Sequence, residues 1–227
     1  MKKVGVILSA VVITVMMLSS CGEDASKEKS ASKEKSASKE VTIGKQVWMT
    51  ENLNVDKFRN GEVVPEAKTV EEWEKAGENK QPAWCYYDND PKNGAKYGKL
   101  YNWYAVNNPR GLAPKGWHVP TDEEWTQLTD YLGGVEKAGA KMKSKNGWSD
   151  NGNGTNSSGF SGLPGGYRYD GVGDGAFDGI GGYGVWWSTT ENVTLNAWDG
   201  YVSYYYGGII RDGSTKRFGF SVRCLRD

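Results

Sequence analysis

The sequence predicts an α+β protein with a short antiparallel sheet, two main helices and a long loop region. Several short segments alternate apolar and polar residues, which indicates strands. Two capping patterns precede residues at helical spacing, which indicates helices. The 31 glycines among 227 residues exclude a helical bundle or a coiled coil, because glycine interrupts long helices. The order along the chain is strand, helices, loop and antiparallel meander.

The first elements of the domain are a hairpin and a short helix. Residues 41–49 alternate around Gly44-Lys45, which indicates two strands joined by a turn. Thr69 and Glu72 form a capping-box pattern, and Gly77 is expected to end the helix that follows.

Two further helices are expected before the loop region. Residues 97–106 place apolar side chains at helical spacing. The clearest helix begins at Thr121, where Glu124 completes a second capping box, and Gly133-Gly134 ends it.

Residues 146–184 are rich in glycine, asparagine and aspartate and show little periodicity. A loop of this length inside a compact domain is uncommon unless it has a function. Strand-like segments with turn signals between them then follow at residues 184–188, 197–206, 208–211 and 218–225.

The composition limits the possible functions. Lys+Arg and Asp+Glu both number 28, so the chain lacks the basic excess that nucleic-acid binding usually needs, and no nucleic-acid partner is expected. His118 is the single histidine, which excludes a multi-histidine metal site. Three cysteines exclude a Cys₄ zinc site.

The N-terminus predicts a lipid-anchored, exported protein. Lys2 and Lys3 precede an apolar run that ends in Leu18-Ser-Ser-Cys21, which resembles a bacterial lipoprotein signal. We expect residues 1–20 to be removed as a signal peptide and Cys21 to carry acyl chains such as palmitate. The alternatives are an ordinary signal peptide or an uncleaved anchor.

Residues 21–40 predict a disordered tether. A six-residue repeat, Ala-Ser-Lys-Glu-Lys-Ser, begins at Ala25 and contains no aromatic or branched apolar side chain. Such a segment has nothing to bury in return for the entropy lost on ordering. We expect it to hold the domain, residues 41–227, away from a membrane of the bacterial cell envelope. An outer-membrane location with exposure at the cell surface is favoured.

Cys85 and Cys224 are the two cysteines of the domain. Export favours a disulfide between them, because oxidising compartments preserve such bonds. The alternative is two separate buried thiols.

Two groups of aspartates are candidate calcium ligands, because Ca²⁺ prefers oxygen ligands supplied by turns. One group follows the cysteine Cys85, and the other recurs every four residues in the loop region. The alternative is that Asp-Gly pairs simply form turns. The candidate ligands are Asp88, Asp90, Asp170, Asp174 and Asp178.

Aromatic side chains near the end of the chain suggest a carbohydrate site. Tryptophan and tyrosine offer flat apolar faces with a polar edge, which suits the C–H faces of sugar rings. The alternative for each residue is a place in the core. The candidate ligand-binding residues are Trp186, Trp198, Tyr201 and Tyr205.

Four motifs carry a family resemblance. Together they resemble the Fibrobacter succinogenes major paralogous domain, a family of exported bacterial proteins that are often lipoproteins. Parts of them also resemble the formylglycine-generating-enzyme branch of the C-type-lectin-like fold, so the resemblance implies that fold. The motifs occur in order at residues 116–125, 159–168, 186–191 and 219–227.

The resemblance implies no settled activity. An oxidase of the formylglycine-generating type uses two reactive cysteines near its C-terminus, and Cys224 has no such partner here. His118 is interpreted as a structural residue. No enzymatic activity is therefore expected, although it stays a third option. The leading interpretation is a surface-displayed binding module with a polysaccharide as its ligand, and the alternative is a structural or adhesive protein that binds another protein.

Overall fold

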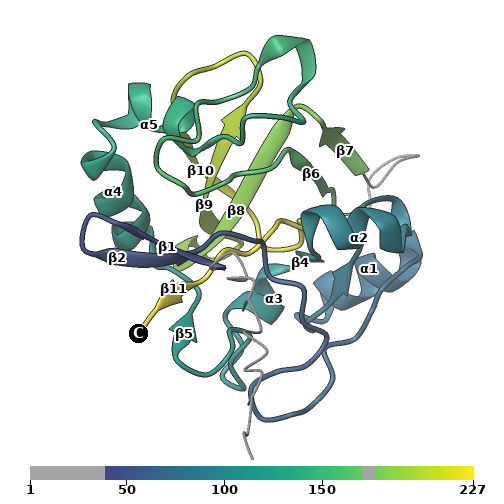
Figure 1. Cartoon of the computed structure of the whole chain (residues 1–227). Coiled ribbons are helices and arrows are strands. Elements are labelled where there is room, and N and C mark those ends of the chain that lie inside the picture. Colours follow the sequence, from purple (N-terminus) through teal and green to yellow (C-terminus); the bar gives the residue numbers. More distant parts are fainter. Residues whose placement is uncertain (1–38, 171–176) are drawn as a thin grey trace, which may run out of the picture. The chain divides into compact units, whose positions relative to one another are not determined.

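The computed structural model describes residues 39–170 and 177–227 (Figure 1). Within them lie three sheets and five α-helices. The helices are α1 (Val70–Glu78), α2 (Pro91–Tyr97), α3 (Trp103–Val106), α4 (Asp122–Tyr131) and α5 (Val135–Met142). The α+β class expected from the sequence is confirmed.

The largest sheet has five strands in the order β10-β9-β8-β6-β7. Strands β8, β9 and β10 pair antiparallel, and β6 joins β8 through a single parallel pair. Its members are β6 (Gly165–Arg168), β7 (Phe177–Ile180), β8 (Tyr183–Val193), β9 (Asn196–Ser203) and β10 (Ile210–Thr215).

The second sheet brings both ends of the domain together in the order β1-β2-β11-β5. Gly44 adopts a φ of +63° between β1 and β2, a conformation that favours glycine in a two-residue hairpin turn. Two further strands, β3 (Trp84–Cys85) and β4 (Leu100–Tyr101), form a separate pair. The four strands are β1 (Glu40–Ile43), β2 (Gln46–Met49), β5 (Trp117–His118) and β11 (Leu225–Arg226).

Both predicted capping boxes are confirmed. The Thr69 side chain accepts from the backbone N–H of Glu72 at the start of α1, and Thr121 does the same with Glu124 at the start of α4. These motifs fix the helix starts because they satisfy backbone N–H groups that have no partner within the helix.

Helices lie on both faces of the five-stranded sheet, as Figure 1 shows. Helices α4 and α5 pack on one face, where Trp125 and Leu128 meet Trp186 and Val202. On the other face Val185 and Trp187 pack with Phe220 and with α3. Both faces of β8 are therefore buried, and this explains why two consecutive tryptophans are both part of the core.

The helix expected over residues 97–106 is wrong. Gly98 adopts a φ of +79°, and a Cβ there would lie 2.8 Å from the carbonyl oxygen of Leu53. This position ends α2, and Asn102 caps α3 after the short β4. The loop expected over residues 146–184 also contains β6 and β7, which a glycine-rich sequence concealed.

The strand expected at residues 218–225 is reduced to Leu225 and a few isolated bridges. This segment instead threads between sheets: Phe220 pairs with Tyr101, and Ser221 pairs with Trp186. It covers one face of the five-stranded sheet.

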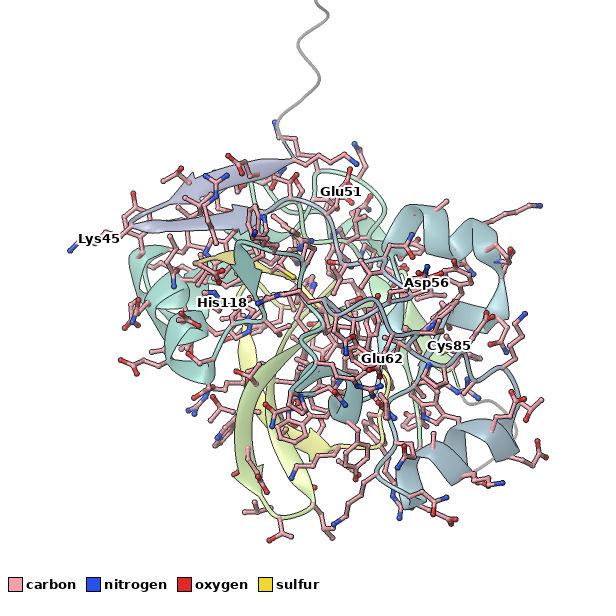
Figure 2. All side chains as sticks on the ribbon, turned by 90° about the horizontal axis from the view of Figure 1, so that it is seen from below. Lys45, Glu51, Asp56, Glu62, Cys85 and His118 are labelled. Atoms are coloured by element: carbon pink, nitrogen blue, oxygen red, sulfur yellow. The ribbon has the colours of Figure 1, made fainter. Side chains whose placement is uncertain are left out.

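The predicted disulfide is absent, because Cys85 and Cys224 are both free and buried. Cys85 packs beside Trp73 and Leu100, whereas Cys224 packs in a different cluster with Phe58 and others. Burial raises the pKa of Cys85 to about 11 and that of Cys224 to about 12, so both are protonated thiols. Figure 2 shows Cys85 among the side chains near α1 and α2, with His118 on the other side of the view.

Buried arginines anchor two of the family motifs. Arg223 donates to the side chain of Asn52 and to the carbonyl oxygens of Met49 and Phe160. Arg168 donates to the carbonyl oxygens of Ala67, at 2.7 Å, and of Thr69, at 2.8 Å. These two arginines therefore connect loop backbones that pack around the sheet.

Candidate functional site

The candidate site is a pocket on the β8–β9–β10 face opposite α4, and we call it the tyrosine pocket. Strand pairing assembles it, because residues two apart on a strand share a face. Asp199 and Tyr201 on β9 pair with Asp212 on β10 and with Val185 on β8. The lining residues are Tyr167, Tyr169, Tyr183, Val185, Asp199, Tyr201, Asp212, Ser214, Phe218 and Phe220.

Aromatic rings form the walls of the tyrosine pocket at steep angles to one another. Tyr167 meets Tyr169 at 80° with ring centroids 5.2 Å apart, and it meets Tyr183 at 79°. Phe218 and Phe220 meet at 74°. These edge-to-face contacts hold the rings in fixed positions. The walls thus support one another, and the cavity has a volume of about 220 Å³.

Asp178 orders the tyrosine hydroxyls at one side of the pocket. Its Oδ2 accepts from Tyr167 at 3.4 Å and from Tyr169 at 3.5 Å, and the two hydroxyls lie 3.1 Å apart. Burial and these neighbours raise the pKa of Tyr167, so its hydroxyl stays protonated. Hydroxyl groups and a carboxylate are therefore offered together at this side.

Asp199 is the most unusual residue of the pocket. The residue is 3% exposed, and its Oδ2 has no hydrogen-bond partner among the described residues. Burial raises the pKa of Asp199 to about 7; the charge of Asp212 adds to the rise, and hydrogen bonds from Ser214 oppose it. A buried polar atom without a partner costs free energy, so a ligand that supplies a donor is favoured here.

The charge of the lining is one-sided. Asp199 and Asp212 contribute carboxylates, and within the described chain no lysine, arginine or histidine lines the pocket. The neighbouring Arg211 points to the opposite face of β10, where it pairs with Asp122 and lies over the ring of Trp198. The pocket therefore favours neutral or cationic ligands over anions.

The structure places the four predicted aromatic residues differently. Tyr201 lines the pocket, and Tyr205 is 62% exposed with its ring 6.2 Å from that of Tyr183. Trp186 is fully buried in the core, so its assignment to a ligand site is wrong. One face of Trp198 is covered by the guanidinium of Arg211, 3.8 Å from the ring centroid.

The pocket residues that the sequence analysis missed are Tyr167, Tyr169, Tyr183, Asp199 and Asp212. One signal was available, namely the alternation of Asp199 with Tyr201 in a segment that reads as a strand. An acidic residue between aromatic neighbours on a buried strand is rarely placed there for stability.

The predicted calcium ligands that the structure describes do not converge. No cluster of three or more metal-ligating side chains occurs in residues 39–170 and 177–227. Asp90 instead caps α2 by accepting from the backbone N–H of Lys92, and Asp88 is exposed with a φ of +53°. Asp178 binds the tyrosine hydroxyls, Asp170 lies at the end of the described segment, and Asp174 lies outside the described residues.

His118 lies between two carboxylates. Nδ1 is 2.9 Å from Asp227, and Nε2 is 3.0 Å from Glu124, which also belongs to the capping box of α4. Burial opposes protonation, but hydrogen bonds to Asp227 and Glu124 outweigh it and raise the pKa of His118. This arrangement ties β5 to α4 and agrees with the structural role expected for His118.

The fold and the pocket define an α+β domain built around an aromatic, acidic cavity. The chain belongs to the Fibrobacter succinogenes major domain family, whose model matches residues 41–226. A search of curated proteins and a search of solved structures each gave no match. Among the described residues no helix has the length and apolar character needed to cross a membrane.

Proposed function

We propose that this protein is a carbohydrate-binding module. The observation that carries the proposal is the tyrosine pocket, where aromatic rings surround the carboxyl groups of the buried Asp199 and the exposed Asp212. Aromatic faces suit the C–H surfaces of a sugar ring, and carboxyl and hydroxyl groups suit its hydroxyls. The cavity is smaller than the ~300–1,000 Å³ common for drug-sized ligands, so it fits a single sugar residue of a longer chain.

The proposal includes the mode of display. We infer that residues 1–20 are a signal peptide, that Cys21 is lipidated, and that residues 21–40 are a tether. The domain would then face outward from the bacterial envelope, at the outer-membrane surface. Acyl chains contribute ~0.8 kcal/mol per buried CH₂, so more than one chain gives stable anchoring.

The proposal also covers the finer fold. We infer a C-type-lectin-like arrangement for the domain. Its support is the order of capped helices followed by a long irregular region and an antiparallel meander. A lectin-like fold is compatible with ligand binding near the tyrosine pocket. A fold alone does not fix a function.

A glycan array tests the function. The chain from residue 21 onward, with Cys21→Ser to keep it unlipidated, is applied with and without EDTA. Saturable binding to one glycan class that Tyr201→Ala abolishes is expected. Tyr131→Ala, which removes an exposed tyrosine outside the pocket lining, is the matched control. No binding to any glycan, or binding that Tyr201→Ala leaves intact, would refute the proposal, and capture of a protein partner alone would favour the adhesive alternative.

A further inference from the structure

We propose that the tyrosine pocket recognises a protonated amine on its ligand, so that the bound sugar is an amino sugar whose nitrogen carries no acyl group. This inference rests on the proposed carbohydrate binding and narrows it to one ligand class. It is drawn from the carboxylates of the pocket, from the unpartnered oxygen of Asp199 and from the angles between the rings.

The first argument is the pairing of like charges. Asp199 and Asp212 are directly opposite each other in the β9–β10 register, and both line the pocket. Like charges in that relation destabilise a sheet, and the burial of Asp199 increases the cost, whereas Asp212 is exposed. A neutral sugar hydroxyl leaves this repulsion in place, whereas a cation bound between the carboxylates offsets it.

The second argument is the unpartnered oxygen. Oδ2 of Asp199 is buried and lacks a donor within the described part of the protein, while Ser214 already hydrogen-bonds to the carboxyl group. An ammonium group supplies three donors from a single atom and forms charge-assisted hydrogen bonds, which are about twice as strong as neutral ones. In the proposed complex one nitrogen donates to Asp199 and to Asp212, its neighbour across the β9–β10 register.

The third argument is the aromatic wall. The ring of Tyr183 stands at 57° to that of Tyr201 and at 79° to that of Tyr167, so several ring orientations meet around one cavity. Ring faces attract cations within about 6 Å of the centroid. Carboxylates and aromatic rings line the same cavity, and these are the two kinds of group that attract an organic cation.

Acylation of the nitrogen would remove its positive charge and two of its three hydrogen-bond donors. An N-acetyl group carries no charge, presents one N–H in place of three, and adds bulk to a cavity of about 220 Å³. The pocket is therefore expected to separate glucosamine from N-acetylglucosamine by charge as well as by size.

Isothermal titration calorimetry at pH 7 tests the inference with three oligosaccharides of equal length. They contain glucosamine, N-acetylglucosamine or glucose. The protein is the chain from residue 21 onward with Cys21→Ser. We expect the glucosamine oligomer to bind at least tenfold more tightly than the other two. Asp199→Asn and Asp212→Asn should each weaken that binding at least tenfold.

The control variant is Asp88→Asn, which removes the same charge from an exposed position outside the pocket and should leave affinity unchanged. Asparagine tolerates the positive φ of residue 88, so this variant is expected to fold. Circular dichroism of all variants separates a lost site from a lost fold.

The outcomes separate this inference from the proposed function. Equal or tighter binding of the N-acetylglucosamine or glucose oligomer overturns the amine assignment and leaves carbohydrate binding standing. Failure of every oligomer here and of every glycan on the array overturns both. A final titration uses choline chloride: binding of choline without binding of the glucosamine oligomer shows an organic-cation site and rejects the amino-sugar assignment.

Discussion

Asp199→Asn should remove a loss of stability that the ionisation of Asp199 causes as the pH rises. The buried carboxyl has a pKa of about 7 in the folded protein, against an ordinary value of 3.8. Between these values the folded state retains a proton that the unfolded state has released. Stability therefore falls as pH rises through this window, is unaffected below it, and stays reduced above pH 7.

The magnitude follows from the two pKa values. Each pH unit in the window costs 1.36 kcal/mol, so the full shift corresponds to about 4 kcal/mol of unfolding free energy above pH 7. Asparagine has nearly the same shape and never ionises. The unfolding free energy of the parent should therefore fall relative to that of Asp199→Asn as the pH rises. Between pH 4 and pH 8.5 this relative change should amount to up to about 4 kcal/mol.

Urea unfolding at several fixed pH values, followed by tryptophan fluorescence, measures this difference without added ligand. Other titrating groups are common to both proteins and cancel in the difference. Asp88→Asn, which changes an exposed aspartate outside the pocket, is measured in parallel as a control. If the Asp199→Asn difference is constant with pH, or moves toward the parent as pH rises, the carboxylate is not held in a costly environment and the reasoning about the pocket fails.

The remaining predictions concern the core, the thiols and the anchor. Arg223→Ala should lower the unfolding free energy measured in urea by about 3 kcal/mol or more. The substitution leaves several carbonyl and amide oxygens without a donor. A loss under about 1 kcal/mol would contradict this expectation. Ellman's reagent should find Cys85 and Cys224 unreactive in the native Cys21→Ser protein and both reactive in guanidinium without reductant; no thiols before reduction would restore the disulfide. Labelled palmitate should enter the wild-type protein in a bacterial host, and Cys21→Ser should abolish labelling and release the protein from membranes. His118→Gln should lower the melting temperature more at pH 5 than at pH 8. The raised pKa of His118 contributes stability that is lost as the pH rises through the folded-state value. An equal loss at both pH values would count against the pairing of His118 with Glu124 and Asp227.

The parts of the fold that could be predicted are those whose cause is local. Thr69 and Thr121 begin helices because each caps residues only three positions away. The turn at Gly44 likewise depends on neighbouring residues. Strands β6 and β7 pair with each other, yet they escaped prediction because Gly165-Gly166 in β6 has the composition of a loop.

The site was harder to predict than the fold because burial is a property of the assembled protein. Tyr201 was named as a candidate for its aromatic ring, and the structure places it in the lining of the pocket. Trp186 was an equal candidate for ligand binding, because Trp186 and Trp187 point to opposite faces of the sheet and one of those faces could have been open. It is buried because α4 covers its side of the sheet while the segment around Phe220 covers the other.

The placement of Asp199 opposite Asp212 in the pocket lowers the stability of the sheet. A sheet that only had to fold would carry an apolar pair where Asp199 faces Asp212, because the apolar pair avoids both desolvation and repulsion. The surrounding rings are already packed against one another, so they do not need the carboxylates for support. Arg223 in the same domain is buried as well, yet it donates to the side chain of Asn52 and to the carbonyl oxygens of Met49 and Phe160. A carboxylate that is buried, opposed by a like charge and left with a free acceptor is best explained by a partner that arrives from solvent, and a cation is the partner that removes all three costs at once.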